Sequence, residues 1–507
     1  MPAFRPTRYA LENREERAMI APDPPFATWV RPPPADRLPI ITALFIVALV
    51  TPLTVLVGPI ALSPTRLVLL VSFAPGLWFL LSGRAGPLVA TDALFLAFTC
   101  WFAAAMVLHH GSAQVERAGQ NALDLLGAYL LARVTITTRR RFDQMIRVLT
   151  LVLSLMLPFA AVEAVSGQQP LNQLLNHLPG LTATERAETR PRLGLHRAQV
   201  SFDHPILFGI ISSSLILMAG LRRCRGRVPA LILAAGLSLS TAALLQVAMH
   251  LALIGWAHVW RGVRARWWLL FGLCVLGYGV VDLASDRSPF RVLVSYATLN
   301  SGSGYHRLLI WEYGLQNVLA NPFFGIGLNE WARPAWLHSN SVDSFWLLVA
   351  MWCGLPGLAL LIAGIAASLV RAIRVPLVEG SQVASCRLAW VLTIVTLCLS
   401  VATVHVWNTA YSYVFFLIGA GVWLGHAREE EERAPDIRPR TERDRPHLRL
   451  VHSRFTLIDS ASSEPPSTPA LQPGTRAAPE RTKRPPPTIY SRFGVRRLRR
   501  LSSTLGP

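Results

Sequence analysis

Repeated apolar stretches, separated by short polar or basic segments, constrain this chain more than any other feature. The sequence has 507 residues, of which 52% are hydrophobic and 15% charged, whereas soluble domains carry roughly a quarter charged residues. Most of the apolar stretches are close to the roughly 20 residues with which a helix crosses a bilayer. The pattern predicts an all-α, polytopic membrane protein.

We predict about twelve membrane-spanning helices. They are Leu38–Val57, Arg66–Leu81, Leu88–Leu108, Gln120–Ile136, Met145–Val165, His204–Leu221, Val228–Ser240, Thr241–Trp260, Trp267–Leu283, Val342–Leu369, Cys386–Val406 and Thr409–Leu424. A polar hinge alone separates Val228–Ser240 from Thr241–Trp260, so these two could also be one span. If they are two spans, all later basic clusters lie on the same side of the membrane as the earlier ones. The charges therefore favour two spans.

The basic residues between the spans predict the topology. Clusters at Arg139–Arg141, Arg222–Arg227, Arg261–Arg266 and Arg371–Arg374 all fall on one side, which the positive-inside rule assigns to the cytoplasm. Both termini are then cytoplasmic. Two long hydrophilic loops, at about 166–203 and 284–341, fall on the opposite side.

The two ends of the chain differ from the apolar part between residues 38 and 425. Residues 1–37 form a charged, proline-rich arm, and residues 426–507 combine the acidic run Glu429–Glu432 with arginines among prolines. Such segments bury too little apolar surface to fold alone, so we predict disordered cytoplasmic tails. Arginines near the end of the tail could rest on anionic membrane lipids. The net charge of +20 comes from arginine clusters that lie between the spans or in the tails, where the positive-inside rule already explains them. We therefore predict no nucleic-acid binding.

The first outer loop ends in a cluster of cations. Three arginines and two histidines crowd the entry to the next span, namely Arg190, Arg192, His196, Arg197 and His204. The guanidinium fork matches phosphate oxygens, so an anionic ligand at the membrane surface would explain arginines on this side. The alternative is that they reach lipid phosphates or pair with Glu185, Glu188 and Asp203.

The second outer loop adds a further cation on a predicted helix. Arg307 and Trp311 are four residues apart, which places them on one helix face. Pro322 should end this helix, and Gly325-Ile326-Gly327 should form a tight turn.

His338 and Asp343 approach the next span just before its apolar run begins. An imidazole or a carboxylate at such a rim could take a proton from an attacking hydroxyl. A single histidine there could equally be an interfacial hydrogen-bonding residue.

Three motifs in order carry a resemblance to a known family. They are Arg192, Gly194, Phe202, His204-Pro205 and Phe208-Gly209; then Arg307, Trp311 and Asn321–Gly327; and then Gly354-Leu355-Pro356-Gly357. From about Leu38 to Leu424, the chain resembles the O-antigen ligase and polymerase superfamily of bacterial inner-membrane proteins.

One position departs from the family pattern. Members commonly show His-Asn at a fixed distance before the glycine pair of the following span, and that histidine position falls on Asp343 here. His338 lies five residues earlier. Either the loop carries a shifted histidine or Asp343 stands in for it.

The resemblance implies a glycosyltransferase in the bacterial inner membrane, with undecaprenyl-diphosphate-linked glycan as donor. Arg192, Arg197 and Arg307 would hold the diphosphate, and His338 or Asp343 would be the catalytic base. Supporting positions would be His204, Trp311, Gly325 and Gly327. The acceptor would be another glycan, in a polymerase, or the lipid A core, in a ligase. We expect no cofactor and no metal.

Two other classes of function stay open. Ionisable groups occur within the predicted spans, among them Asp92, Asp124, Glu163 and His250, and such groups often mark a transport pathway. A transporter or flippase of a lipid-linked or small solute is therefore one alternative. The other is an inactive scaffold in a polysaccharide export complex, which would fit the missing His-Asn pair.

Overall fold

A computed structural model describes most of the chain between residues 36 and 427. The described ranges are 36–57, 60–176, 182–183, 189–222, 224–263, 265–286, 288–289, 291–292, 301–338, 341–378 and 380–427. All of them belong to the first of two compact units, Met1–Asp436 and Ile437–Pro507. The predicted disorder of the two tails concerns residues that are almost all outside the described ranges.

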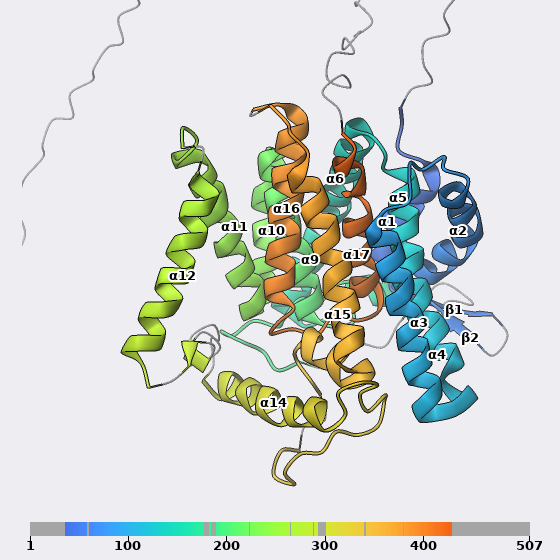
Figure 1. Ribbon diagram of the computed structural model, residues 1–507, viewed down its shortest axis with the longest axis vertical. Coiled ribbons are helices and arrows are strands. Elements are labelled where there is room, and N and C mark those ends of the chain that lie inside the picture. The colour runs from blue at the N-terminus through green and yellow to red at the C-terminus, as the bar shows by residue number, and fades with distance from the viewer. Residues whose placement is uncertain are drawn as a thin grey trace, which may run out of the picture. The chain divides into compact units, whose positions relative to one another are not determined.

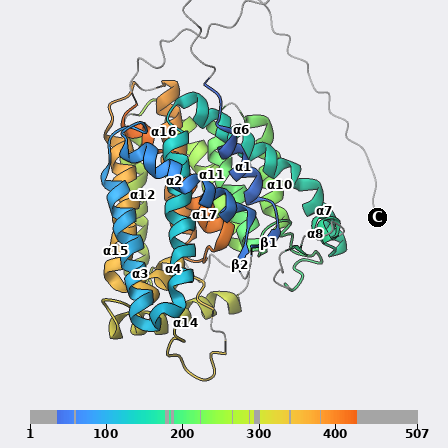
Figure 2. The ribbon, with the colours of Figure 1, turned by 90° about the vertical axis from the view of Figure 1, so that its right-hand side faces the viewer.

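The described part is almost entirely helical, as predicted (Figure 1). The α-helices are α1 (Ile40–Leu49), α2 (Pro64–Leu81), α3 (Ala90–His110), α4 (Val115–Ala122), α5 (Ala128–Thr135), α6 (Arg139–Leu155), α7 (Leu157–Ser166), α8 (Pro170–Asn176), α9 (Pro205–Leu221), α10 (Val228–Leu237), α11 (Thr241–Val259), α12 (Arg266–Ala284), α14 (Ser301–Ala320), α15 (Phe345–Arg374), α16 (Gln382–Ser400) and α17 (Asn408–Gly419). Short 3₁₀ or π segments are η2 (Gly111–Gln114), η3 (Leu123–Gly127), η4 (Arg225–Arg227) and η5 (Val422–Gly425). Figure 2 shows α3 and α4 side by side.

Seven helical stretches of the described residues are long and apolar enough to cross a membrane. One of them, Ala90–Thr135, runs through α3, α4 and α5 and has 46 residues. Two shorter apolar helices, α1 and α9, have the composition of spans but fewer residues. The chain is therefore a multi-pass helical membrane protein, while the count of twelve stays a prediction.

The first predicted span, Leu38–Val57, is wrong in its second half. Helix α1 ends at Leu49, and Leu53–Val57 forms the strand β1, which pairs with β2 (Ile60–Leu62) and β3 (Thr182–Ala183) in a small antiparallel sheet of order β2-β1-β3. Pro52 explains the early end, because proline lacks an amide donor and disfavours helical backbone in the residue before it.

Helices α10 and α11 are separate, as the predicted division after Ser240 requires; that both cross the membrane stays a prediction. Leu239 adopts a left-handed φ of 47°, and Ser238 and Leu239 donate hydrogen bonds back into the last turn of α10. The backbone amide of Ala198 donates to the carbonyl of Leu237 at 3.0 Å. The turn between the two helices therefore lies beside the first long loop, at what we call the outer end.

A buried ion pair joins three helices at the opposite, inner end. Arg222, which follows α9, donates to both carboxylate oxygens of Asp143 on α6, at 2.8 and 2.7 Å. It also donates to the carbonyl of Gln382, the first residue of α16, at 2.9 Å. Two predicted basic clusters, at Arg139–Arg141 and Arg222–Arg227, therefore lie at the same end of the bundle, in agreement with the predicted topology.

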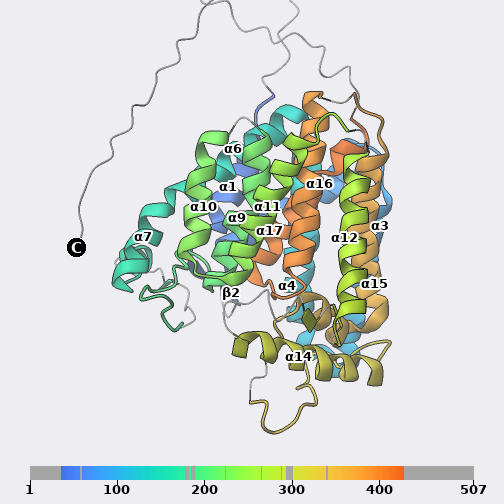
Figure 3. The same cartoon turned by 90° about the vertical axis from the view of Figure 1, so that its left-hand side faces the viewer.

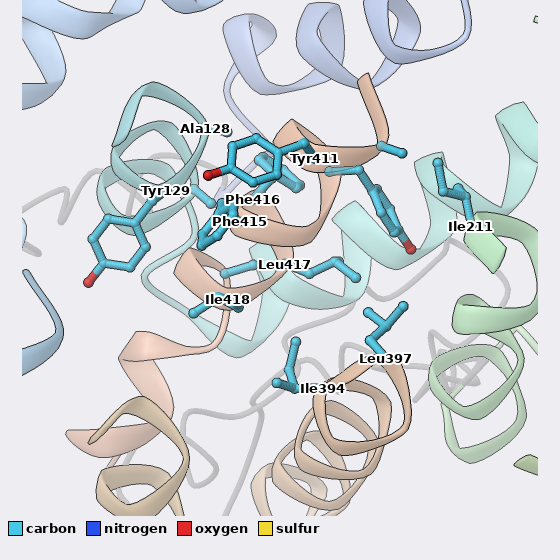
Figure 4. Packing of buried hydrophobic residues seen from close by; sticks show 14 of the residues in the cluster. Ala128, Tyr129, Ile211, Ile394, Leu397, Tyr411, Phe415, Phe416, Leu417 and Ile418 are labelled. Atoms are coloured by element: carbon cyan, nitrogen blue, oxygen red, sulfur yellow. The ribbon is translucent and has the colours of Figure 1, made fainter. Parts of the chain in front are cut away.

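Helix α17 forms the centre of the core. Its side chains Phe415, Phe416 and Leu417 are buried, and it packs closely on α5 (Figure 4). A β-carbon at Gly419 would lie 2.3 Å from the carbonyl oxygen of Tyr129. The helix therefore needs a glycine at this crossing.

Helix α14 has a different orientation from its neighbours. It lies across the outer end of the bundle, crosswise to α15 (Figures 1 and 3). This position brings the second long loop over the outer ends of the membrane-spanning helices.

Candidate active site

A break in α15 fixes the position of the predicted glycine turn. Cys353 and Gly354 have non-helical backbone angles inside this helix. The turn donates from Ile326 to the carbonyl of Met351 at 2.7 Å, and in return Leu355 donates to the carbonyl of Pro322 at 2.7 Å. The break thus frees backbone groups of α15 that hold the turn against it.

The two predicted glycines are required by this contact. Gly325 has a φ of 67° and Gly327 a φ of 62°, which is the left-handed region that favours glycine. A β-carbon at Gly325 would lie 2.3 Å from the oxygen of Met351, and one at Gly327 would lie 2.7 Å from Nε2 of His110. The predicted end of the helix before Pro322 and the tight turn are both confirmed.

The turn and the α15 break together form one wall of a cavity at the outer end. Its volume is about 800 Å³. Its charged and imidazole side chains are Arg117, His204, Arg307, Glu330, Asp343 and His405, and its tryptophans are Trp331, Trp352 and Trp407. A cavity of this size, with aromatic walls and a few polar groups, is typical of a ligand site.

Arg307 and Asp343 lie next to each other in this cavity. Nε of Arg307, on α14, is 3.8 Å from Oδ2 of Asp343, which immediately precedes the N-cap of α15. The guanidinium side chain is 11% exposed and the carboxylate side chain 43% exposed. Trp311 and Arg307 line a small adjoining pocket together, which confirms that they share a helix face.

Arg192 and Arg197 lie on the first long loop and are not part of the cavity wall. Arg192 donates to the carbonyl of Leu239 at 3.0 Å, and Arg197 donates to that of Ser238 at 3.4 Å. Burial, and then the charge of Arg192, lower the pKa of Arg197 to about 10. Nη2 of Arg197 is buried and has no hydrogen-bond partner within the described residues.

The three predicted arginines therefore form one electrostatic cluster. Burial lowers the pKa of Arg307, Asp343 raises it, and Arg192 lowers it again. Within the described ranges, Asp343 supplies the one ion pair that the three arginines make. The cluster has more positive than negative charge, and a bound anion would relieve this imbalance.

His204 supports the same region. Its Nδ1 accepts a hydrogen bond from the amide of Ile206 at 3.1 Å and so caps α9. Burial and the charges of Arg197 and Arg192 lower the pKa of His204 to about 4. The imidazole is thus neutral near pH 7.

The structure separates the two predicted candidates for the base. Asp343 lines the cavity beside Arg307, whereas His338 is exposed and is not among the residues of the cavity wall. Residues 339 and 340, which follow His338, lie outside the described ranges. Of the two candidates, the cavity wall therefore contains Asp343.

Sequence reasoning missed several side chains of the cavity wall, among them His405, Trp407 and Arg117. The predicted span Cys386–Val406 placed His405 in the membrane, but α16 ends at Ser400, where successive turns cap the helix. Residues 401–407 form a loop that carries His405 and Trp407 into the cavity, and α4 adds Arg117. Polar residues interleaved between Thr403 and Thr409 were a usable signal for this loop.

Ionisable groups within the helices have partners inside the protein. Asp124 forms an ion pair of 2.7 Å with Arg66, and Glu163 accepts a hydrogen bond from the amide of Val200 at 2.8 Å. Both nitrogens of His250 are hydrogen-bonded, to Ser213 and Thr396. These contacts join neighbouring parts of the fold, so Asp124, Glu163 and His250 have a structural role that does not require a transport pathway.

The fold and the cavity together define a helical membrane protein with a cationic site at one end. A family model described as O-antigen ligase matches residues 228–362, and this stretch contains Arg307, the glycine turn, His338 and Asp343. The chain therefore carries a domain of the O-antigen ligase and polymerase superfamily, as the motifs predicted, and the match indicates an activity of that type. No curated protein matches the chain.

The described residues contain no group of three or more His, Cys, Asp or Glu side chains placed to hold a metal ion. The metal independence of the reaction stays a prediction.

Proposed function

We propose that the protein is a glycosyltransferase that moves a glycan from undecaprenyl diphosphate to a sugar acceptor. The acceptor is a growing glycan in a polymerase or the lipid A core in a ligase. The observation that carries the proposal is the cluster of Arg192, Arg197 and Arg307 at the cavity of the outer end, in which Asp343, directly beside Arg307, supplies the one ion pair that these arginines make among the described residues.

The arginine cluster suits a diphosphate. Arg307 lies on the cavity wall, the charge of Arg192 acts on both Arg307 and Arg197, and neither Arg192 nor Arg197 makes an ion pair in the described part of the chain. Charge-assisted hydrogen bonds from guanidinium to phosphate are stronger than neutral ones. They strengthen further as negative charge develops on the leaving group, which makes them suitable for catalysis.

Asp343 is the proposed base. Its carboxylate would take the proton from the acceptor hydroxyl as the oxygen forms a bond to the anomeric carbon of the donor glycan. The bond between that carbon and the diphosphate oxygen breaks, and its electron pair stays on the diphosphate. Arg307 lies next to Asp343, so one cavity can hold the attacking and the leaving oxygen.

The location follows from the same proposal. The site would face the periplasm from the bacterial inner membrane, with about twelve spans and both termini in the cytoplasm, since the basic clusters lie at the opposite end. Reporter fusions at Asn329 and Asn172 should then both report the periplasm.

Site variants in a deletion strain test the proposal. Arg307→Ala and Arg192→Ala should each abolish transfer of glycan to the acceptor, observed as loss of surface polysaccharide on a gel. Arg190→Ala is the matched control, because this residue belongs to the same loop and is exposed; it should behave as wild type.

Normal transfer by Arg307→Ala at wild-type protein level would exclude the diphosphate clamp. A different outcome, the accumulation of untranslocated lipid-linked glycan in Arg307→Ala, would favour the flippase alternative. Unchanged transfer in every variant of a cavity residue would favour the scaffold alternative.

A further inference from the structure

A second, smaller chamber adjoins the outer cavity. Its volume is about 180 Å³, and Arg117, Trp352, His405 and Trp407 line both spaces. We call it the inner chamber. Its remaining walls come from α2, α3, α4, η3, α15 and the start of α17, so it lies outside the part of the chain that the family model matches, except for α15 and Leu328.

The polar wall of the inner chamber is held rigidly. Arg66 donates to Asp124 through Nε and Nη2, at 3.2 and 2.7 Å, and Ser412 donates to the same carboxylate at 3.2 Å. Asn408 donates to Asp203 at 2.9 Å. The charges of Arg66 and Asp124 compensate each other, so this pair offers hydrogen bonds without a net charge. The remaining cation, Arg117, lies where the chamber meets the outer cavity.

Two buried polar atoms of the chamber lack partners. Oδ1 of Asn121 and Nδ1 of His405 are both buried, and neither has a hydrogen-bond partner among the described residues. Buried polar groups in folded proteins are nearly always hydrogen-bonded. Asn121 and His405 both line the chamber, so a ligand in the chamber could satisfy them.

Aromatic rings form another part of the chamber wall. His405 stacks between Trp407, at a ring-centroid distance of 5.4 Å, and Phe345, at 6.3 Å. Trp352 meets His405 edge-on at 5.9 Å. Burial lowers the pKa of His405 to about 4, so this wall is also uncharged near pH 7.

The two spaces therefore differ in the ligand chemistry they suit. The cluster of Arg192, Arg197 and Arg307 at the outer cavity has surplus positive charge and suits an anion. The inner chamber combines aromatic faces with amides and the Arg66–Asp124 ion pair, and its further cation, Arg117, is shared with the outer cavity. A sugar ring presents C–H faces that pack on aromatic rings and hydroxyls that both donate and accept hydrogen bonds. At ~30 Å³ per water molecule, the chamber holds about six waters, which is the scale of one sugar ring and too small for a longer glycan.

We infer that the inner chamber binds one uncharged pyranose ring, with Asn121 and His405 as hydrogen-bonding partners and Trp407 and Trp352 as the aromatic wall. Its role as the subsite of the acceptor sugar rests on the proposed function. In that role, the ring would direct a hydroxyl across the boundary toward the outer cavity, whose wall includes Asp343.

Direct binding of small probes tests the inference without any transfer reaction. The full chain in detergent is mixed in turn with methyl glucoside, galactoside, mannoside and N-acetylglucosaminide, and ligand contact is measured by saturation-transfer NMR. We expect a signal from at least one glycoside with the wild-type protein. Asn121→Leu should reduce it at least fivefold, since it removes the amide at similar volume.

Three variants complete the experiment. Asn172→Leu is the matched control, because Asn172 lies on α8 and is not part of either wall; its glycoside signal should equal that of the wild type. Arg307→Ala should keep the glycoside signal and lose the binding of inorganic pyrophosphate, measured by phosphorus NMR. Asn121→Ser replaces Asn121→Leu if the latter does not elute as a folded monodisperse peak.

The two hypotheses fail in different ways. No signal from any glycoside, or an unchanged signal in the Asn121 variant, would overturn the inner-chamber inference and leave a chamber filled with water only. Absent pyrophosphate binding in the wild-type protein would instead count against the diphosphate site, and would not affect the sugar result.

Discussion

The contact between the glycine turn and the α15 break allows a quantitative prediction for Gly325→Ala. The turn lies against the break through three backbone hydrogen bonds, of which the one from Gly327 to Trp352 is 3.2 Å and those from Ile326 and Leu355 are 2.7 Å. A β-carbon at Gly325 would lie 2.3 Å from the carbonyl oxygen of Met351 and 2.8 Å from the carbonyl carbon of Trp352. These contacts are with backbone atoms of α15, which cannot shift as the end of a flexible side chain can. The glycine turn must therefore move away from α15.

The expected cost has two parts. A left-handed φ costs a non-glycine residue about 1 kcal/mol. Loss of the three backbone hydrogen bonds adds roughly 3 kcal/mol, at about 1 kcal/mol each. In a chain of this length, unfolding entropy scales such that 1 kcal/mol shifts the midpoint of thermal unfolding by roughly 1 °C. We therefore expect Gly325→Ala to lower the midpoint by about 4 °C.

Gly83→Ala is the matched control for this prediction. Gly83 has a φ of 72° and nothing within 4 Å of its β-position, so alanine there meets the backbone strain without the clash. Its midpoint should fall by only about 1 °C. Thermal unfolding of both variants in the same detergent measures the difference. Equal shifts for the two variants would refute the argument that the turn is held by close backbone contact.

Three further predictions concern the proposed base Asp343, the buried imidazole of His405, and the ion pair between Arg222 and Asp143. Asp343→Asn should reduce the initial rate of glycan transfer by about a hundredfold or more, and His338→Ala should stay within about twofold; the reverse order would make His338 the base. Because burial lowers the pKa of His405 from 6.5 to about 4, the unfolded chain binds a proton that the folded chain does not, so stability falls as pH decreases through that window. The thermal midpoint measured from pH 7 to 4.5 should fall less in His405→Phe, and parallel curves would contradict the assignment. Arg222→Ala leaves a buried carboxylate unpaired and should destabilise the fold by about 3 kcal/mol, whereas Arg225→Ala, at an exposed position, should cost less than about 0.5 kcal/mol in the same thermal assay.

The sequence predicted the helical membrane architecture because apolar runs report directly on span length. It also predicted the division between α10 and α11, since charge placement depends on how many times the chain crosses. The end of α1 was missed, although Pro52 was visible in the sequence. The long apolar run outweighed one proline, and the strand partner β3 lies more than a hundred residues away in the chain.

The arginines and the glycine turn were predictable because each has a strong local requirement. A cation on the outer face needs an explanation, and two closely spaced glycines after a proline indicate a turn. Asp343 and His338 could not be separated from sequence, since both approach the same rim and only the fold decides which one faces Arg307.

The inner chamber could not be predicted at all. Asn121 and His405 lie 284 positions apart in the numbering and meet only because α4 and the loop before α17 pack together. Their unpartnered atoms are defined by what surrounds them in space. The sequence offered only two polar residues near the ends of predicted spans.

Binding of undecaprenyl diphosphate, without its glycan, is the most direct test of the central claim that the arginine cluster holds a polyprenyl diphosphate. Its dissociation constant can be measured by native mass spectrometry on wild-type protein, Arg307→Ala and Arg190→Ala. A hydrogen bond to a charged group contributes about 1.5–3 kcal/mol, so Arg307→Ala should weaken binding at least about tenfold, and Arg190→Ala should bind as wild type. Equal dissociation constants for all three proteins would contradict the account.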